Sequence, residues 1–88
     1  MTAANPPLTT VLLCLRVSTD GDPSVLTRLL GHFHNLNVIP RRVVAEFGSN
    51  ALLHVQVDVS GLSEQRLSLI TAKVGQIPTV LHAYWHHL

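Results

Sequence analysis

The segment that decides the fold is Val17–Leu26, which reads VSTDGDPSVL. It begins in an apolar, β-prone run and ends in a helical pattern, so we expect a buried strand to turn into a helix here. Asp22 is placed to accept hydrogen bonds from the free amides of the first helical turn. Pro23 suits the first helical position because it has no amide hydrogen. Gly21 permits the sharp approach of the chain to the helix.

The residues before this turn predict a central strand. Residues 10–17 form a continuous apolar run in which Arg16 is the only charge, as is typical of a strand in the middle of a sheet. Residues 1–9 are small, polar and proline-bearing, and they lack the basic start and apolar run of a signal peptide. We therefore expect a flexible tail over 1–9, a single domain over 10–88 and a cytoplasmic location. The lone cysteine, Cys14, fits a reducing compartment.

The residues after the turn alternate between helical and strand spacing. They predict a helix that starts at Pro23, and then in order a strand (38–47), a short turn (48–50), a strand (51–59), a helix (62–76) capped by Ser63 or Ser60, and a strand (79–86). Pro40 lacks an amide donor, which favours a sheet edge for the second strand. This order predicts an α+β, ferredoxin-like βαββαβ sandwich. Its four-stranded antiparallel sheet has the order 4-1-3-2, with both helices on one face.

The other face of this sheet is not covered by the helices, and its apolar side chains need a packing partner. Hydrophobic residues make up 47% of the chain and charged residues only 12%, against about 25% charged in an ordinary domain. The uncovered face mixes apolar and polar side chains, which favours a dimer or higher oligomer, formed through this face or through paired edge strands. We expect the interface to include Leu12, Cys14, Val44, Leu52, His54, Val80, His82 and Tyr84.

Composition argues against several functions. The net charge is only +1 and Arg41-Arg42 is the only basic pair, so nucleic acid is not an expected partner. No apolar run approaches the roughly 20 residues that span a membrane. The carboxylates are scattered, Cys14 lies in mid-strand, and no phosphate loop or nucleophile elbow is present in the sequence. We therefore expect no catalytic residues, no enzyme activity and no cofactor.

Six histidines raise the alternative of a metal-binding protein. His54, His82 and Cys14 are expected on the uncovered face, where they could form one row. Imidazole and thiolate are suitable zinc ligands. Neither paired CxxC nor HxxxH spacing supports such a site, so the favoured interpretation is that these side chains are half-buried polar groups of an interface, and no metal is expected.

Two short motifs resemble those of ACT domains, small βαββαβ modules that regulate amino-acid metabolism. Residues 23–26 (PSVL) resemble the family's Pro-Gly-x-Leu at the start of the first helix, and residues 36–38 (LNV) resemble its Ile-Asn-Ile step into the second strand. The predicted order and spacing of elements match the family from about Thr10 to His86. The resemblance thus extends over nearly the whole chain.

A chain of this length resembles the small regulatory subunits of acetolactate synthase, an enzyme of branched-chain amino-acid biosynthesis. The resemblance implies a non-catalytic dimer that binds the large catalytic subunit and an effector amino acid such as valine. The alternative is an amino-acid sensor without an enzyme partner. In the family the effector commonly lies at a dimer interface, and amides at a helix N-terminus favour its carboxylate. The corresponding positions are Gly21, Asp22, Pro23, Ser24, Asn37 and Val38.

The sequence departs from the family pattern at Ser24, where the family has glycine. A side chain at this position obstructs a ligand that approaches the backbone, and the Asp22 carboxylate repels a ligand carboxylate. Two hypotheses therefore stay open: a subunit that binds an effector, and an interaction module that does not.

Overall fold

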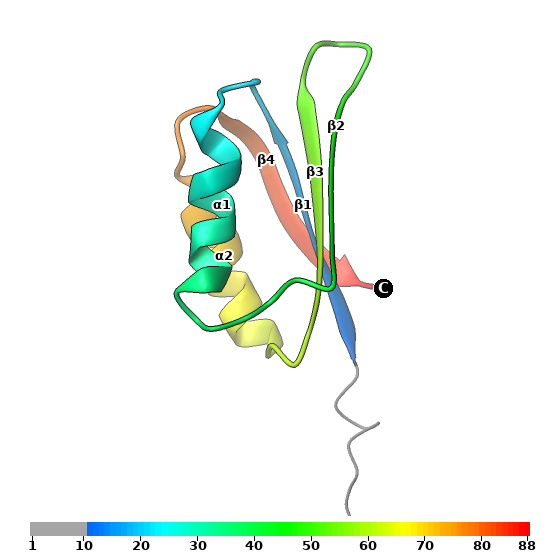
Figure 1. Cartoon of the computed structure of the whole chain (residues 1–88), viewed down its shortest axis with the longest axis vertical. Helices are drawn as coiled ribbons and strands as arrows, with labels where there is room; N and C mark the ends of the chain where they lie inside the picture. Colours follow the sequence, from blue (N-terminus) through cyan, green and yellow to red (C-terminus); the bar gives the residue numbers. More distant parts are fainter. Residues whose placement is uncertain (1–10) are drawn as a thin grey trace, which may run out of the picture.

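The computed structural model describes residues 11–88, so the predicted tail over 1–9 lies outside the described residues. The elements are β1 (Leu12–Thr19), α1 (Ser24–His34), β2 (Arg42–Phe47), β3 (Leu53–Ser60), α2 (Glu64–Gly75) and β4 (Val80–His87). The strands form one antiparallel sheet in the order β2-β3-β1-β4. Both helices lie on one face of this sheet (Figure 1). The ferredoxin-like βαββαβ prediction is confirmed.

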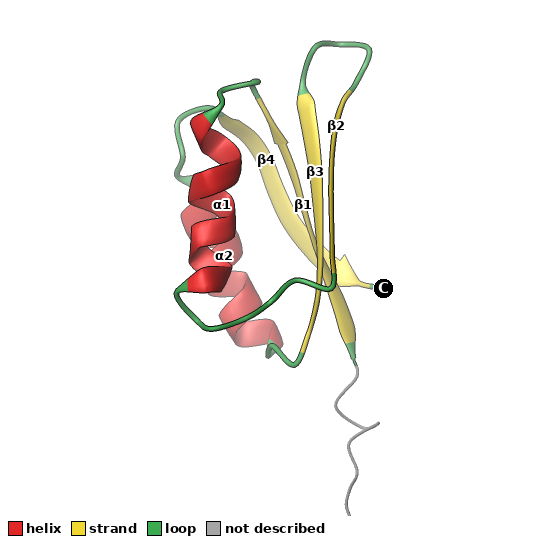
Figure 2. Ribbon diagram, viewed as in Figure 1, coloured by secondary structure: helices red, strands yellow, loops and turns green. Residues whose placement is uncertain are grey.

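The core lies between the sheet and the helices, which form two separate layers (Figure 2). Alternate residues of β1 and β3 point into it, and each helix contributes one apolar stripe: Leu13, Leu15, Val17, Val55, Val57 and Val59 meet Val25, Leu29, Phe33, Leu67, Ile70 and Val74. Burial of one such side chain stabilises the fold by about 1.5–3 kcal/mol. Strand β1 lies between β3 and β4, as its apolar run predicted.

The helices begin where side-chain oxygens meet free amides. Helix α2 follows Ser63, whose hydroxyl accepts a hydrogen bond from the Arg66 amide at 3.1 Å. Of the two predicted caps, Ser63 is therefore the one that acts. Helix α1 begins at Ser24, one residue later than predicted, because Pro23 has helical dihedrals but lies just outside the hydrogen-bonded helix. None of the helices among residues 11–88 has the length and apolar character needed to cross a membrane.

The β2–β3 hairpin differs from the prediction in its lengths. Strand β2 begins at Arg42 instead of residue 38, after the left-handed Asn37 (φ 58°) and Pro40. Strand β3 begins at Leu53 instead of residue 51, because Ala51 is also left-handed (φ 65°) and donates its amide to the Gly48 carbonyl at 3.1 Å. The connecting loop is therefore longer than the predicted three residues. Strand β2 lies at the sheet edge, as Pro40 indicated.

A β-bulge changes the face of one predicted interface residue. Thr19 pairs with Val80, but Ser18 pairs with His82, so β4 has one extra residue, Leu81, at this point. The bulge turns Val80 to the helix side, where it packs against the core. The prediction that Val80 lies on the uncovered face is wrong, since strict alternation along β4 does not hold across the bulge.

Candidate functional site

The turn between β1 and α1 is held against the start of β4. The Thr19 side chain is fully buried, and its hydroxyl donates a hydrogen bond to the Thr79 carbonyl at 2.8 Å. The Asp20 amide donates to the same carbonyl at 3.0 Å. Two hydrogen bonds to a single acceptor fix the position from which residues 21–24 leave the sheet.

The Asp22 carboxylate closes this turn from within. One oxygen accepts hydrogen bonds from the Ser24 amide at 2.9 Å and from the Ser24 hydroxyl at 3.0 Å. These bonds, the backbone bond first, hold the pKa of Asp22 below its usual value because they stabilise the charged form. The carboxylate thus supplies the hydrogen bonding predicted for Asp22, and it occupies the Ser24 amide at the start of α1.

An aromatic ring covers the glycine of the turn. A Cβ atom at Gly21 would lie 2.9 Å from Cε1 of Phe47, closer than such contacts occur in proteins. With the ring in this position, only glycine fits at residue 21. A larger residue there would require the ring to move. The ring itself is 67% exposed. Phe47, which the sequence analysis did not assign to the ligand site, lies at its edge.

The remaining predicted ligand residues lie at the far end of α1. Asn37 and Val38 follow the helix, and the Val38 amide donates to the Phe33 carbonyl at 3.0 Å. A helix of 11 residues is about 16 Å long, and the chain before it and the chain after it lie at its opposite ends (Figure 1). One chain therefore does not bring the two groups of predicted ligand residues together.

The uncovered sheet face brings Cys14 together with polar side chains. Strand register places Cys14 beside Asp58 and His86, and the thiol is fully buried by its neighbours. Burial first, and then the hydrogen bond and the charge of Asp58, raise the pKa of Cys14 from 9.0 to about 11. Such a thiol is a weak metal ligand and a weak nucleophile near neutral pH.

His54 lies in a different row. Its Nδ1 is 3.0 Å from the hydroxyl oxygen of Ser18, and His82 pairs with Ser18 from the other side. Cys14 lies four residues along β1 from Ser18, or about 13 Å away. The prediction that Cys14, His54 and His82 form one row is therefore wrong. Within residues 11–88 no three His, Cys, Asp or Glu side chains are grouped so that they could hold a metal ion.

The predicted interface residues are unequally available. Leu12, His54, His82 and Tyr84 are exposed, and Val44 and Leu52 are half-buried. Cys14 is covered by its own chain, and Val80 is half-buried on the helix side of the sheet, where it packs against the core. Participation of the other six in an interface stays a prediction. The sequence analysis missed Ser18, although its alternation with Arg16 along β1 placed it on the same face.

A family model described as an ACT-like domain matches residues 8–88, which is nearly the whole chain. The chain belongs to this ACT-like family. Domains of the ACT type are typically non-catalytic regulatory modules and often dimerise. No curated protein sequence matches this ACT-like domain.

Solved structures share the fold of the ACT-like domain at low sequence identity. The C-terminal domain of MgtC from Mycobacterium tuberculosis has a TM-score of 0.78 and 11% identity over 98% of this chain and 94% of its own. The ACT domain of a GTP pyrophosphokinase from Chlorobium tepidum has a TM-score of 0.72 and 12% identity over 89% and 100%. A homoserine dehydrogenase from Thiobacillus denitrificans has a TM-score of 0.74 and 15% identity. This likeness covers 98% of this chain and 20% of the dehydrogenase. These likenesses establish the fold.

Proposed function

We propose that this ACT-like domain is a non-catalytic regulatory module that dimerises and modulates an enzyme of amino-acid metabolism, with acetolactate synthase as its partner. Membership of the ACT-like family over residues 8–88 is the observation that carries the proposal. Similar domains lie within a GTP pyrophosphokinase and a homoserine dehydrogenase, so the fold occurs attached to enzymes. The PSVL and LNV motifs resemble those of ACT domains in general, and the narrower assignment to acetolactate synthase rests on the resemblance of this chain to the small regulatory subunits of that enzyme.

The proposed effector site lies between two protomers. Gly21, Asp22, Pro23 and Ser24 of one protomer would meet Asn37 and Val38 of the other, because these two groups lie about 16 Å apart along α1 of a single chain. The effector carboxylate would compete with Asp22 for the Ser24 amide. Its aliphatic group would lie against Val38 of the other protomer.

Mixed dimers test this arrangement. A Gly21→Val variant adds a branched side chain to the first group, where a Cβ atom alone would lie 2.9 Å from Cε1 of Phe47, and an Asn37→Pro variant disrupts the second group. Each variant alone is expected to lose valine binding by calorimetry. An unfolded and refolded mixture is expected to regain it in the heterodimers, about half of the population if pairing is random. A mixture that binds no better than its components, although each variant keeps the circular dichroism spectrum of the unchanged chain, would contradict a site shared between protomers.

Co-expression with the acetolactate synthase catalytic subunit of the same organism tests the partner. We expect a tagged ACT-like domain and the catalytic subunit to elute together in size-exclusion chromatography, in fixed proportion and at high salt. A domain that elutes alone at every concentration would contradict the proposal. In that case, stabilisation of the domain by a free amino acid, about 2.7 kcal/mol at 100 times the dissociation constant, would identify a sensor without an enzyme partner.

A further inference from the structure

A groove separates the two helices on the outer side of the molecule. Its hollow has a volume of about 370 Å³, within the range of about 300–1,000 Å³ that is usual for small-molecule sites. The end of α1 and the middle of α2 line it with His32, Asn35, Leu36, Arg66, Leu69, Ile70 and Lys73. This groove lies at the end of α1 opposite to the turn at residues 21–24, so it is separate from the proposed effector site.

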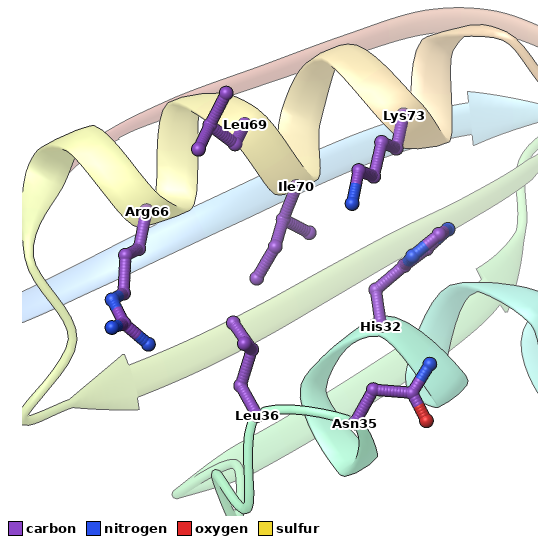
Figure 3. Close-up of a pocket in the computed structure, with 7 residues that line it drawn as sticks. All are labelled: His32, Asn35, Leu36, Arg66, Leu69, Ile70 and Lys73. Atoms are coloured by element: carbon purple, nitrogen blue, oxygen red, sulfur yellow. The ribbon is translucent and has the colours of Figure 1, made fainter.

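The side chains of the groove have a definite arrangement. Leu36 and Ile70 point toward each other across the gap and form an apolar centre (Figure 3). Lys73 and His32 lie together at one end, and Arg66 lies at the other end (Figure 3). Seven residues of helix separate Arg66 from Lys73, which is about 10 Å. The groove therefore has an apolar centre between two cationic ends.

The positive charge of the groove is not neutralised by the chain itself. A second hollow shares His32 and Lys73 with the groove and adds Arg28. Half of the six Lys and Arg residues of the chain thus line the two hollows, and none of the five acidic residues does. Over residues 11–88 Arg42 pairs with the opposite charge of Asp58, and the His87 ring lies against the Glu64 carboxylate. Arg66 and Lys73, which line the groove, take part in neither contact and are therefore available to an external anion.

We propose that the groove between α1 and α2 binds a small amphiphilic anion, with a carboxylate or phosphate head on Lys73 or Arg66 and an apolar body on Leu36 and Ile70. Charge complementarity selects an anion, since an uncompensated cationic site favours one. The apolar centre selects an organic ion over an inorganic one, because Leu36 is 37% exposed and loses this contact with water when it is covered. The volume of the hollow, about 370 Å³, suits a small molecule better than a larger partner.

Titration of the isotope-labelled domain with octanoate, followed by two-dimensional NMR, tests the proposal. We expect saturable shifts of the amide signals of residues 32–36 and 66–73 while the signals of residues 20–24 stay in place. Acetate has the carboxylate head of octanoate without its hydrocarbon chain, and octylammonium has the hydrocarbon chain with the opposite charge. Both are expected to bind at least about tenfold more weakly than octanoate. A tenfold difference corresponds to about 1.4 kcal/mol. Octyl phosphate distinguishes the two head groups, and tighter binding of either one supports the proposal.

Charge-removing variants provide a second test of the proposal. An Arg66→Gln, Lys73→Gln double variant is expected to weaken octanoate binding at least about tenfold. Arg41→Gln removes an exposed charge outside the groove and is the matched control, for which no change is expected. Equal affinity of the double variant and the control, or equal shifts with octylammonium, would overturn the proposal. Binding of an acidic amphipathic peptide at these residues without any binding of octanoate would overturn it in favour of a protein partner.

Discussion

Asp22 and Ser24 together explain why α1 begins where it does. The carboxylate satisfies the Ser24 amide, so the helix end is stable without a bound molecule. The Ser24 hydroxyl strengthens this arrangement, whereas glycine at the same position would leave the backbone open. The Ser24 side chain therefore limits the space at the turn, while the Asp22 carboxylate occupies the backbone donor of Ser24.

A Ser24→Gly variant is expected to bind valine more tightly than the unchanged domain, because it removes both the obstructing side chain and one hydrogen bond to Asp22. Ser24→Ala keeps the Cβ atom and removes only the hydroxyl, so it is the matched control and is expected to gain little. Isothermal titration calorimetry measures all three affinities. If none of them binds valine, the turn is purely structural.

The raised pKa of Cys14 predicts how the stability of the domain depends on pH. The pKa of Cys14 is raised from 9.0 to about 11 in the fold, so the folded state favours the neutral thiol. The resulting stabilisation is complete below pH 9 and is lost as the pH rises from 9 through 11. The difference in unfolding free energy between the unchanged domain and Cys14→Ala is therefore expected to shrink over this window, as measured by urea unfolding at a series of pH values. A difference that stays constant from pH 8 to pH 11 would show that the thiol titrates normally.

At the scale of the elements, the edge strand β2 exposes several apolar side chains. Val43 is 42% exposed, Phe47 is 67% exposed and Ile39, just before the strand, is 86% exposed. The helices were expected to cover this side of β2, but its side chains remain open to water. An edge strand of this kind favours pairing with a second chain, so we propose that a dimer forms through β2.

Val43→Lys is expected to weaken dimerisation at least about tenfold, because it places a charge in the apolar contact. Leu81→Lys makes the same change on β4 at the opposite edge, at a residue that is 56% exposed, and is expected to leave the solution mass unchanged. Analytical ultracentrifugation compares the two. Dissociation by Tyr84→Lys instead of Val43→Lys would assign the dimer to the uncovered sheet face.

At the scale of the whole molecule, the fold was predictable because its signals are local and repeated. The apolar run of residues 10–17, Pro40 at the edge and the cap at Ser63 each specify one element, and the six elements specify the sheet order. The β-bulge at Leu81 was not predictable, because no residue type marks it. It moved Val80 to the other face. Likewise, strand register decides which side chains lie side by side across the sheet. Alternation alone placed Cys14 in one row with His54, whereas the neighbours of Cys14 in the register are Asp58 and His86.

The candidate site was predictable only in part. The resemblance to the family indicated one group of residues before α1 and another after it, but the sequence does not show whether the two groups meet within one chain or between two protomers. The groove between the helices was missed for a similar reason. Arg66 and Lys73 looked like ordinary charged positions of an exposed helix face, and only the packing of α1 beside α2 brings them near His32.

The account depends most on the claim that this ACT-like domain regulates an enzyme. The direct measurement is the rate of acetolactate formation by the purified catalytic subunit as the domain is added, with and without valine. We predict a saturable change in rate, with a further change when valine is present, since a regulatory module acts through a complex with defined stoichiometry. A rate that stays constant across the titration, at concentrations where the domain is a folded dimer, would contradict the claim.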